Sequence, residues 1–347
     1  MHKENLFGST LSRLEEIVSE LGLPIYSARQ IALWLYRHRA ESFEEMTNIS
    51  KKIRAELDKH YYIGINSPVS FSESDDGTKK YLYKISAAAG NSVAKYIETA
   101  WIPEKNRGTL CVSSQIGCKR GCSFCMTGKQ GLQGNLSAGE ILNQYRSLPE
   151  AEKVTNFVFM GMGEPLDNIE EVLNTLEILT SEWGYGFSPK KVTVSTIGIL
   201  DGLKKLLDSS SCRLALSLHS PFPEEREKII PSEKTNPFKE VLRIFRENNS
   251  VRSSRRRLTV EYVMLSGVND TPGHSSELAR VLNGLNVRVN LIPYHSIPGF
   301  SGKPSPPEKM EAFRTALLNK GIFATIRKSR GQDIQAACGM LSTGGNI

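Results

Sequence analysis

Strands and helices alternate along the chain from residue 109 onward, and this alternation limits the possible folds more than any other feature. Short apolar runs typical of buried strands are separated by amphipathic stretches with helical spacing. One stretch begins with Ser137-x-x-Glu140, a capping-box pattern. Such alternation favours a parallel α/β barrel over an α+β layout. The expected strands cover residues 110–114, 157–160, 192–195, 214–218, 259–264, 287–292 and 324–326, and the expected helices cover residues 137–147, 169–180, 202–208, 237–247, 275–285 and 307–320.

The part of the chain before this alternation has two other patterns. Residues 11–62 carry apolar side chains at helical spacing and are expected to form short helices. Residues 68–102 predict a β meander, with turns at Ser74-Asp-Asp-Gly77 and Gly90-Asn91. We therefore expect a helical domain over residues 1–66, a β-meander extension over 67–107, and a barrel core with its C-terminal segment over 108–347.

Polar motifs follow directly after several expected barrel strands. They are the cysteine loop at 118–125, Gly161-Met-Gly-Glu-Pro165, Ser195-Thr-Ile-Gly198, His219 and Tyr294-His295. Catalytic groups of α/β barrels gather at the C-terminal ends of the strands. The sequence therefore predicts one site, built from all of these motifs, at that rim.

Composition narrows the class of protein further. No apolar run of the 347 residues is long enough to span a bilayer, and the first residues lack the pattern of a signal peptide. Six cysteines, three of them crowded together, suit a reducing compartment, so we expect a cytoplasmic protein. The formal net charge of +7 makes an anionic partner plausible. The excess lies outside residues 1–66 and includes two clusters, Arg252/Arg255/Arg256/Arg257 and Arg327/Lys328/Arg330.

Three cysteines with C-x3-C-x2-C spacing, Cys118, Cys122 and Cys125, form the most telling motif. Three thiolates at this spacing can hold three irons of a [4Fe–4S] cluster and leave the fourth iron open. The spacing resembles that of radical S-adenosylmethionine (SAM) enzymes, in which the open iron binds SAM and the cluster's electron cleaves it to a 5′-deoxyadenosyl radical. The alternative is a zinc knuckle, but zinc sites usually combine two C-x2-C pairs and this chain has one.

Several of the motifs after strands suit SAM binding. Gly163 and Glu164 could bring backbone carbonyls and a carboxylate to the amino group of SAM, although the same stretch could be only a tight turn. Ser195 and the run Ser217-Leu218-His219 could bind its ribose and carboxylate. A satisfied buried histidine would explain His219 almost equally well.

Four other residues have ordinary structural explanations when taken singly. Cys338 and Cys111 would usually be small buried hydrophobic residues, and Glu98 a paired surface carboxylate. Cys212 has no partner motif, and we assign it to the core.

Taken together, the motifs resemble the bacterial radical-SAM RNA methyltransferases that methylate C2 of adenosine in 23S rRNA and in tRNA. The resemblance covers residues 20–342. Besides the cysteine triplet, it rests on Glu98-Thr-Ala-Trp-Ile-Pro-Glu, Thr109-Leu-Cys-Val-Ser-Ser-Gln, Phe159-Met-Gly-Met-Gly-Glu-Pro, Ser195-Thr-Ile-Gly, Leu216-Ser-Leu-His-Ser, Glu261-Tyr-Val-Met-Leu and Asp333-Ile-Gln-Ala-Ala-Cys-Gly.

The resemblance implies a partial (β/α)6 radical-SAM barrel and a reaction that uses two SAM molecules. One SAM methylates Cys338, and the radical made from the second converts that methyl group into a carbon radical. Adenine C2 is too electron-poor to attack a SAM methyl group, whereas a carbon radical can add there and tether the RNA to Cys338. Glu98 then removes the C2 proton. Cys111 attacks the sulfur of Cys338 to release the RNA, leaving a disulfide that needs a reductant.

The implied partners are 23S rRNA, tRNA and an electron donor such as flavodoxin, and we expect a monomer. The resemblance also makes residues 1–66 an RNA-binding domain, acting through patches such as Arg37/Arg39 and Lys51/Lys52/Arg54. His295 stands where many members carry Asn, and we expect it to donate one hydrogen bond to SAM.

Two alternatives remain. One is the related activity that methylates C8 of the same rRNA adenine and gives antibiotic resistance. Pro165, Pro293 and the run Arg327-Lys-Ser-Arg330 favour the C2 group over it. The other is a non-catalytic RNA-binding protein with a structural metal site.

Overall fold

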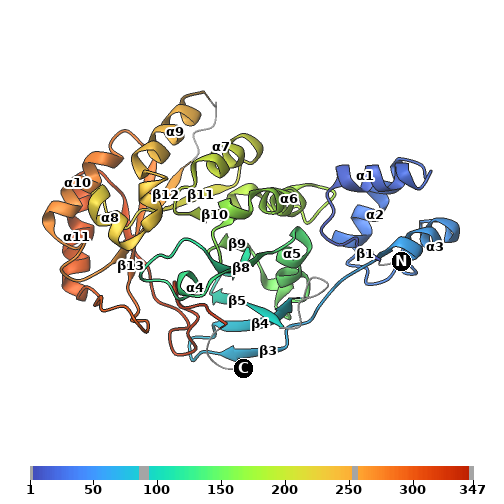
Figure 1. Ribbon diagram of the computed structural model, residues 1–347, viewed down its shortest axis with the longest axis horizontal. Helices are drawn as coiled ribbons and strands as arrows, with labels where there is room; N and C mark the ends of the chain where they lie inside the picture. The colour runs from blue at the N-terminus through green and yellow to red at the C-terminus, as the bar shows by residue number, and fades with distance from the viewer. Residues whose placement is uncertain (1–2, 86–93, 252–256, 344–347) are drawn as a thin grey trace.

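The computed structural model describes residues 3–85, 94–251 and 257–343 of the chain (Figure 1). None of the helices in these ranges has the length and apolar character that crossing a membrane requires. The predicted turn at Gly90-Asn91 and the basic residues Arg252, Arg255 and Arg256 lie outside the described residues.

A ten-stranded sheet forms the centre of the molecule, in the order β14-β13-β12-β11-β10-β9-β6-β5-β4-β3. Its parallel part is an open barrel, since β14 is an edge strand and the meander extends the sheet beyond β6. This arrangement agrees with the predicted partial (β/α)6 barrel. The parallel strands are β6 (Arg107–Cys111), β9 (Asn156–Phe159), β10 (Val192–Thr196), β11 (Arg213–Ser217), β12 (Leu258–Met264), β13 (Val287–Pro293) and β14 (Ala324–Ile326).

Helices follow the parallel strands and cover the outer face of the barrel (Figure 1). The predicted helices are present, and Ser137 and Glu140 form the predicted capping box. The sequence analysis missed α8, a short helix that proves important for the site. The helices are α5 (Ala138–Arg146), α6 (Ile169–Thr180), α7 (Leu200–Ser209), α8 (Pro223–Ile229), α9 (Phe238–Val251), α10 (Pro272–Leu282) and α11 (Pro307–Asn319).

The first barrel strand differs from its prediction. We expected residues 110–114, but β6 ends at Cys111 because Ser113 leaves the ladder: its N–H donates to Oε1 of Gln144 at 2.8 Å. The chain then forms an unpredicted antiparallel pair, β7 (Gln115–Cys118) and β8 (Gly131–Asn135), with α4 (Met126–Lys129) between its strands. This hairpin carries the cysteine loop.

The predicted meander is confirmed for the described residues. It comprises β3 (Ser70–Glu73), β4 (Lys79–Ile85) and β5 (Lys95–Glu104), all antiparallel, and β5 joins it to β6. The meander also anchors the C-terminal segment. Ser74 and the N–H of Asp75 donate to the carboxylate of Asp333, at 2.6 and 3.3 Å, and Gly331 N–H donates to Asp76 at 3.0 Å.

The N-terminal elements pack against the barrel and share its core. They are β1 (Glu4–Asn5), α1 (Leu11–Glu20), α2 (Tyr26–Tyr36), α3 (Lys51–His60) and β2 (Tyr61–Tyr62). Tyr36 contacts the rings of Trp183 and Tyr185, which follow α6. Arg37 and Arg39 bind barrel groups: the carbonyl of Glu182 at 2.9 Å and the carboxylate of Glu152 at 3.2 Å. Their contact with RNA stays a prediction.

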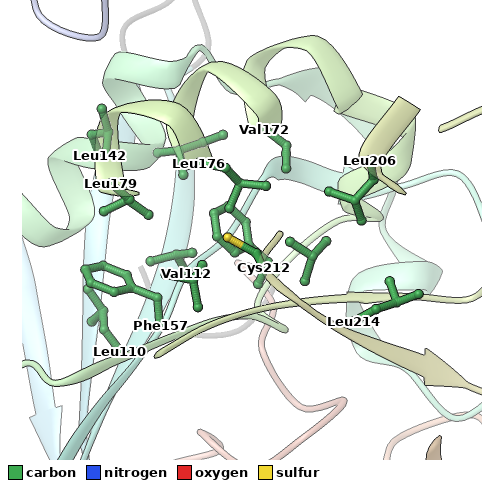
Figure 2. Close-up of a cluster of buried hydrophobic side chains, with 14 of the residues drawn as sticks. Leu110, Val112, Leu142, Phe157, Val172, Leu176, Leu179, Leu206, Cys212 and Leu214 are labelled. Atoms are coloured by element: carbon green, nitrogen blue, oxygen red, sulfur yellow. The ribbon is translucent and has the colours of Figure 1, made fainter. Parts of the chain in front are cut away.

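The barrel core lies between the sheet and its covering helices. Figure 2 shows side chains of α5, α6 and α7 packed against those of β6, β9 and β11. Cys212 lies in this cluster and is buried, which confirms its assignment to the core. The apolar side chains of the barrel helices are buried against the sheet. The polar side chains gather elsewhere, at the C-terminal ends of the strands.

Candidate active site

The three cysteines lie on one short loop above the barrel. Cys118 ends β7, and Cys125 precedes α4. The loop is held by an ion pair between Arg120 and Asp167, and by the N–H of Ser123, which donates to the carbonyl of Ile229 at 3.0 Å. All three cysteines line one cavity, called here the rim cavity. It is also lined by Glu164, Ser195, Ser217, His219 and Cys338, among others, so the predicted motifs other than Tyr294-His295 meet at one place.

The donor set fits a [4Fe–4S] cluster. Burial raises the pKa of all three thiols, that of Cys118 to about 12, and a bound iron–sulfur cluster would favour their thiolate forms. In the described ranges no three His, Cys, Asp or Glu side chains are placed to hold a single metal ion. The ligands of an iron–sulfur cube meet three different irons and need no common point.

Gly163 and Glu164 have the geometry of a tight cradle. Gly163 has φ +100°, and a Cβ there would lie 2.6 Å from the side chain of Gln115. Glu164 is buried, and its two carboxylate oxygens accept from the N–H groups of Leu166 at 3.1 Å and Ile197 at 3.0 Å. Burial raises the pKa of Glu164 to about 7. A buried carboxylate facing a cavity is suited to an ammonium group, which would favour its ionised form.

The ends of β10 and β11 are held together by a residue that the sequence analysis missed. Arg226 of α8 is fully buried and ion-paired with Glu233. It donates to the carbonyls of Ile197, Ser217 and Leu218 at 2.7, 2.9 and 2.9 Å. Ser195 and Ser217 therefore line the cavity from a fixed backbone, whereas Leu218 is buried. The only sequence signal was a basic residue in a short, Pro-initiated stretch.

His219 is neutral and strained. Its backbone has φ 59°, which is rare outside glycine, and such strain concentrates at functional sites. The N–H of Val263 donates to its Nδ1 at 2.9 Å, so the proton of the neutral ring is on Nε2. Burial lowers the pKa of His219 to about 3. The ring lines the rim cavity and can offer one hydrogen-bond donor there.

Cys338 lies where the C-terminal segment crosses the barrel. It is exposed and lines the rim cavity, and Met126 N–H donates to the carbonyl of Gly339 at 2.8 Å. Cys111 ends β6 in a small apolar cluster with Ala336. Burial raises the pKa of the Cys111 thiol to about 12, and the nearby Cys338 adds to this effect. Arg327 is within electrostatic range of both sulfurs, and the charge at Cys338 raises its pKa.

Glu98 lies on β5 beneath the C-terminal segment. It is buried, and its carboxylate accepts from Nζ of Lys80 at 2.8 Å and from the N–H of Ser342 at 2.8 Å. Burial raises the pKa of Glu98, and the bonds to Lys80 and Ser342 oppose this. The ordinary explanation, a paired surface carboxylate, is half right: the carboxylate is paired, but it is not at the surface.

His295 lies apart from the expected position. Its Nε2 is 2.9 Å from Oγ of Ser329, and burial lowers its pKa. The side chain lines a second cavity inside the barrel, called here the interior cavity. A contact between His295 and SAM stays a prediction.

Open barrel and cysteine loop together define a radical SAM enzyme, and the family model for the Radical SAM superfamily matches residues 112–277. A second model, for the ribosomal RNA large subunit methyltransferase N-terminal domain, matches residues 4–63. The relatives narrow the class further, and the chain belongs to the RlmN family of dual-specificity RNA methyltransferases.

Two curated relatives and one solved structure illustrate the similarity. The chain is 50% identical to the probable dual-specificity RNA methyltransferase RlmN of Phocaeicola vulgatus, covering 98% of this chain and 95% of that protein. It is 41% identical to the dual-specificity RNA methyltransferase RlmN of Geotalea uraniireducens, over 98% of this chain and 97% of that protein. A radical SAM methyltransferase from Sphaerobacter thermophilus superimposes with a TM-score of 0.87 at 38% identity, covering 97% of this chain and 99% of that one.

Proposed function

We propose that the enzyme methylates C2 of adenosine in 23S rRNA and in tRNA, through a methylated Cys338 and a covalent RNA adduct, using two SAM per turnover. One observation carries the proposal: Cys338 lines the same cavity as the cysteine triplet, with Cys111 close to it. The names of the relatives support two RNA substrates. The proposed partners also include an electron donor such as flavodoxin, and the proposed assembly is a monomer.

The triplet and the cradle would hold the cofactors. Cys118, Cys122 and Cys125 would ligate the [4Fe–4S] cluster, and Gly163, Glu164, Ser195, Ser217 and His219 would bind SAM. When bound, the cofactors supply a methyl group and, separately, an adenosyl radical that can abstract a hydrogen atom. The buried Glu164 and the neutral His219 would offer an acceptor and a donor of fixed orientation, which favours one bound pose.

Cys338 would carry the new carbon. Its thiolate takes the methyl group, and after loss of one hydrogen atom the methylene radical on its sulfur bonds to C2 of adenine. The radical adduct then loses the C2 proton and one electron, for which the oxidised [4Fe–4S] cluster would be the acceptor. Arg327 lies within electrostatic range of this sulfur.

Glu98 would be the base that takes the C2 proton. Its raised pKa makes the carboxylate a stronger base than an exposed glutamate, and Lys80 keeps it ionised. Cys111 would then attack the sulfur of Cys338 and break the bond between that sulfur and the methylene carbon. The carbon leaves with the electron pair of this bond and takes a proton, which gives the methyl group. The resulting disulfide takes two electrons from a reductant to restore both thiols.

Nucleoside mass spectrometry tests the proposal. Reconstituted enzyme is incubated anaerobically with SAM, a reductant and either 23S rRNA or tRNA, and the RNA is digested. We expect 2-methyladenosine from both RNAs. 8-Methyladenosine would move the enzyme to the resistance group, and SAM cleavage without any methylated base would contradict the RNA assignment.

A further inference from the structure

The interior cavity lies within the barrel and has a volume of about 360 Å³. It meets the rim cavity, because Cys338, Arg327 and Glu261 line both. From there it extends toward the N-terminal ends of the strands, where Arg107 and Arg213 are the first residues of β6 and β11. A strand rises about 3.3 Å per residue, so the cavity runs the length of the barrel below the reacting sulfur.

Five arginines line this cavity. Arg330 is ion-paired with Asp76 at 3.9 Å, and the other four come from different strands and loops: Arg107, Arg213, Arg288 and Arg327. None of these four forms an ion pair with another described residue. The guanidinium of Arg288 lies 4.8 Å from the ring centre of Phe323, and its Nε is buried without a hydrogen-bond partner. Buried donors of this kind are almost always satisfied in native proteins, so the atom indicates a missing acceptor.

The charge of the cavity is strongly positive. Burial lowers the pKa of Arg107, Glu104 opposes this effect, and Arg327 and Arg213 add to it, so Arg107 lies within electrostatic range of both other cations. Only two lining residues are acidic, Glu104 and Glu261, and Glu261 already accepts from Asn290 at 2.9 Å. Several convergent guanidinium groups match the oxygens of a phosphate better than those of any neutral ligand.

We propose that the interior cavity is a phosphate subsite that binds one backbone phosphodiester next to the target adenosine. The inference rests on the proposed function and adds to it a path for the RNA strand. A flipped nucleotide whose base reaches Cys338 carries its phosphates to the adjoining cavity. Phosphate contacts of this kind fix the register of the RNA and leave recognition of the base to the rim cavity.

Two substitutions at the far end of the cavity test the subsite. Arg213→Gln and Arg288→Gln remove cations that lie away from the cysteines and from the rim cavity. Arg314→Gln is the matched control, because Arg314 is on the outer helix α11 and pairs with Glu311. We expect each cavity variant to bind a target RNA hairpin about tenfold more weakly than the wild type. The slope of log K against log salt concentration should become shallower by about 1. The control should change neither, and SAM cleavage without RNA should stay at the wild-type rate.

A modified hairpin locates the contact. Replacing one phosphate beside the target adenosine with a neutral methylphosphonate, on the 5′ side or on the 3′ side, should weaken binding to the wild type at one of these positions. The same replacement should weaken RNA binding by Arg288→Gln or Arg213→Gln much less, because these variants have already lost the contact with that phosphate. The inference would be overturned if the effects of the arginine substitution and of the methylphosphonate on binding free energy were fully additive at both positions. It would also be overturned if both variants bound RNA with wild-type affinity.

Two controls separate the inference from other outcomes. Orthophosphate should compete with RNA in the wild type at matched ionic strength and lose this effect in the variants. If it binds the cavity while both variants keep wild-type RNA affinity, the site serves a free phosphate and the RNA assignment is overturned. Should Arg288→Gln not fold, as thermal unfolding would show, Arg213→Gln decides alone. Failure of the proposed function can be told apart from failure of the phosphate subsite, because in the first case the wild type would produce no methylated adenosine.

Discussion

Glu98 is held between opposing influences, burial that favours the neutral acid and Lys80 that favours the carboxylate. Because the proposed base must be ionised, the rate of C2 proton removal should fall as the pH drops through its raised pKa. Lys80→Met removes the ammonium and should raise that pKa further, so the acid limb of the methylation rate moves to higher pH. Rate measurements across pH under single-turnover conditions check this.

Lys84→Met is the matched control, because Lys84 is on β4 like Lys80 but is exposed, and the ion pair of Glu98 is with Lys80. Its pH profile should coincide with that of the wild type. An acid limb that stays in place in Lys80→Met, or moves to lower pH, would show that Lys80 does not set the ionisation of the base.

Residues of the site differ in how well the sequence predicts them. The cysteine triplet and Glu164 stand in compact motifs whose chemistry can be derived from spacing. Arg226 could not be predicted, because its role depends on three carbonyls that only the folded barrel brings around it. The position of His295 was equally hidden, since a strand end does not say which of two cavities the next side chain faces.

At the scale of elements, the meander acts as a support for the C-terminal segment. The turn at Ser74-Asp-Asp-Gly77, which the sequence predicted only as a hairpin turn, binds Gly331 and Asp333 at the start of the loop that leads to Cys338. Such long-range pairing leaves no local pattern in a sequence. The strands and helices of the barrel do leave one, and their predicted positions differ from the observed ones mainly at the ends.

Loss of this support should impair methyl transfer to RNA without impairing SAM cleavage. Asp333→Ala removes the acceptor of Ser74 and of the Asp75 N–H, so Cys338 is no longer held in one place. We expect methyl transfer to RNA to fall on the order of tenfold to a hundredfold, with SAM cleavage in the absence of RNA unchanged. Product and 5′-deoxyadenosine are quantified side by side, and Gln332→Ala, an exposed neighbour, serves as control. Equal yields in both variants would argue against a positioning role.

At the scale of the whole molecule, the N-terminal helices and the barrel form one core. Tyr36 and Trp183 contact across the junction, and Arg37 binds the carbonyl of Glu182. Removal of residues 1–66 should therefore lower the melting temperature by at least a few degrees, since a loss of about 1 kcal/mol lowers it by about 2–4 °C in chains of about 150–250 residues. Thermal unfolding of the truncated chain, compared with a Lys51→Gln/Lys52→Gln variant that should melt like the wild type, checks this. An unchanged melting temperature after truncation would mean that the two parts are independent.

The central claim is that Cys338 carries the methyl carbon to adenine and that Cys111 releases the product. Anaerobic turnover of Cys111→Ala followed by mass spectrometry of the digested protein tests it most directly. The account predicts that this variant accumulates RNA bonded through one carbon to Cys338, and that Cys111→Ala/Cys338→Ala accumulates none. Free methylated RNA released by Cys111→Ala at the wild-type rate, with no adduct on Cys338, would contradict it.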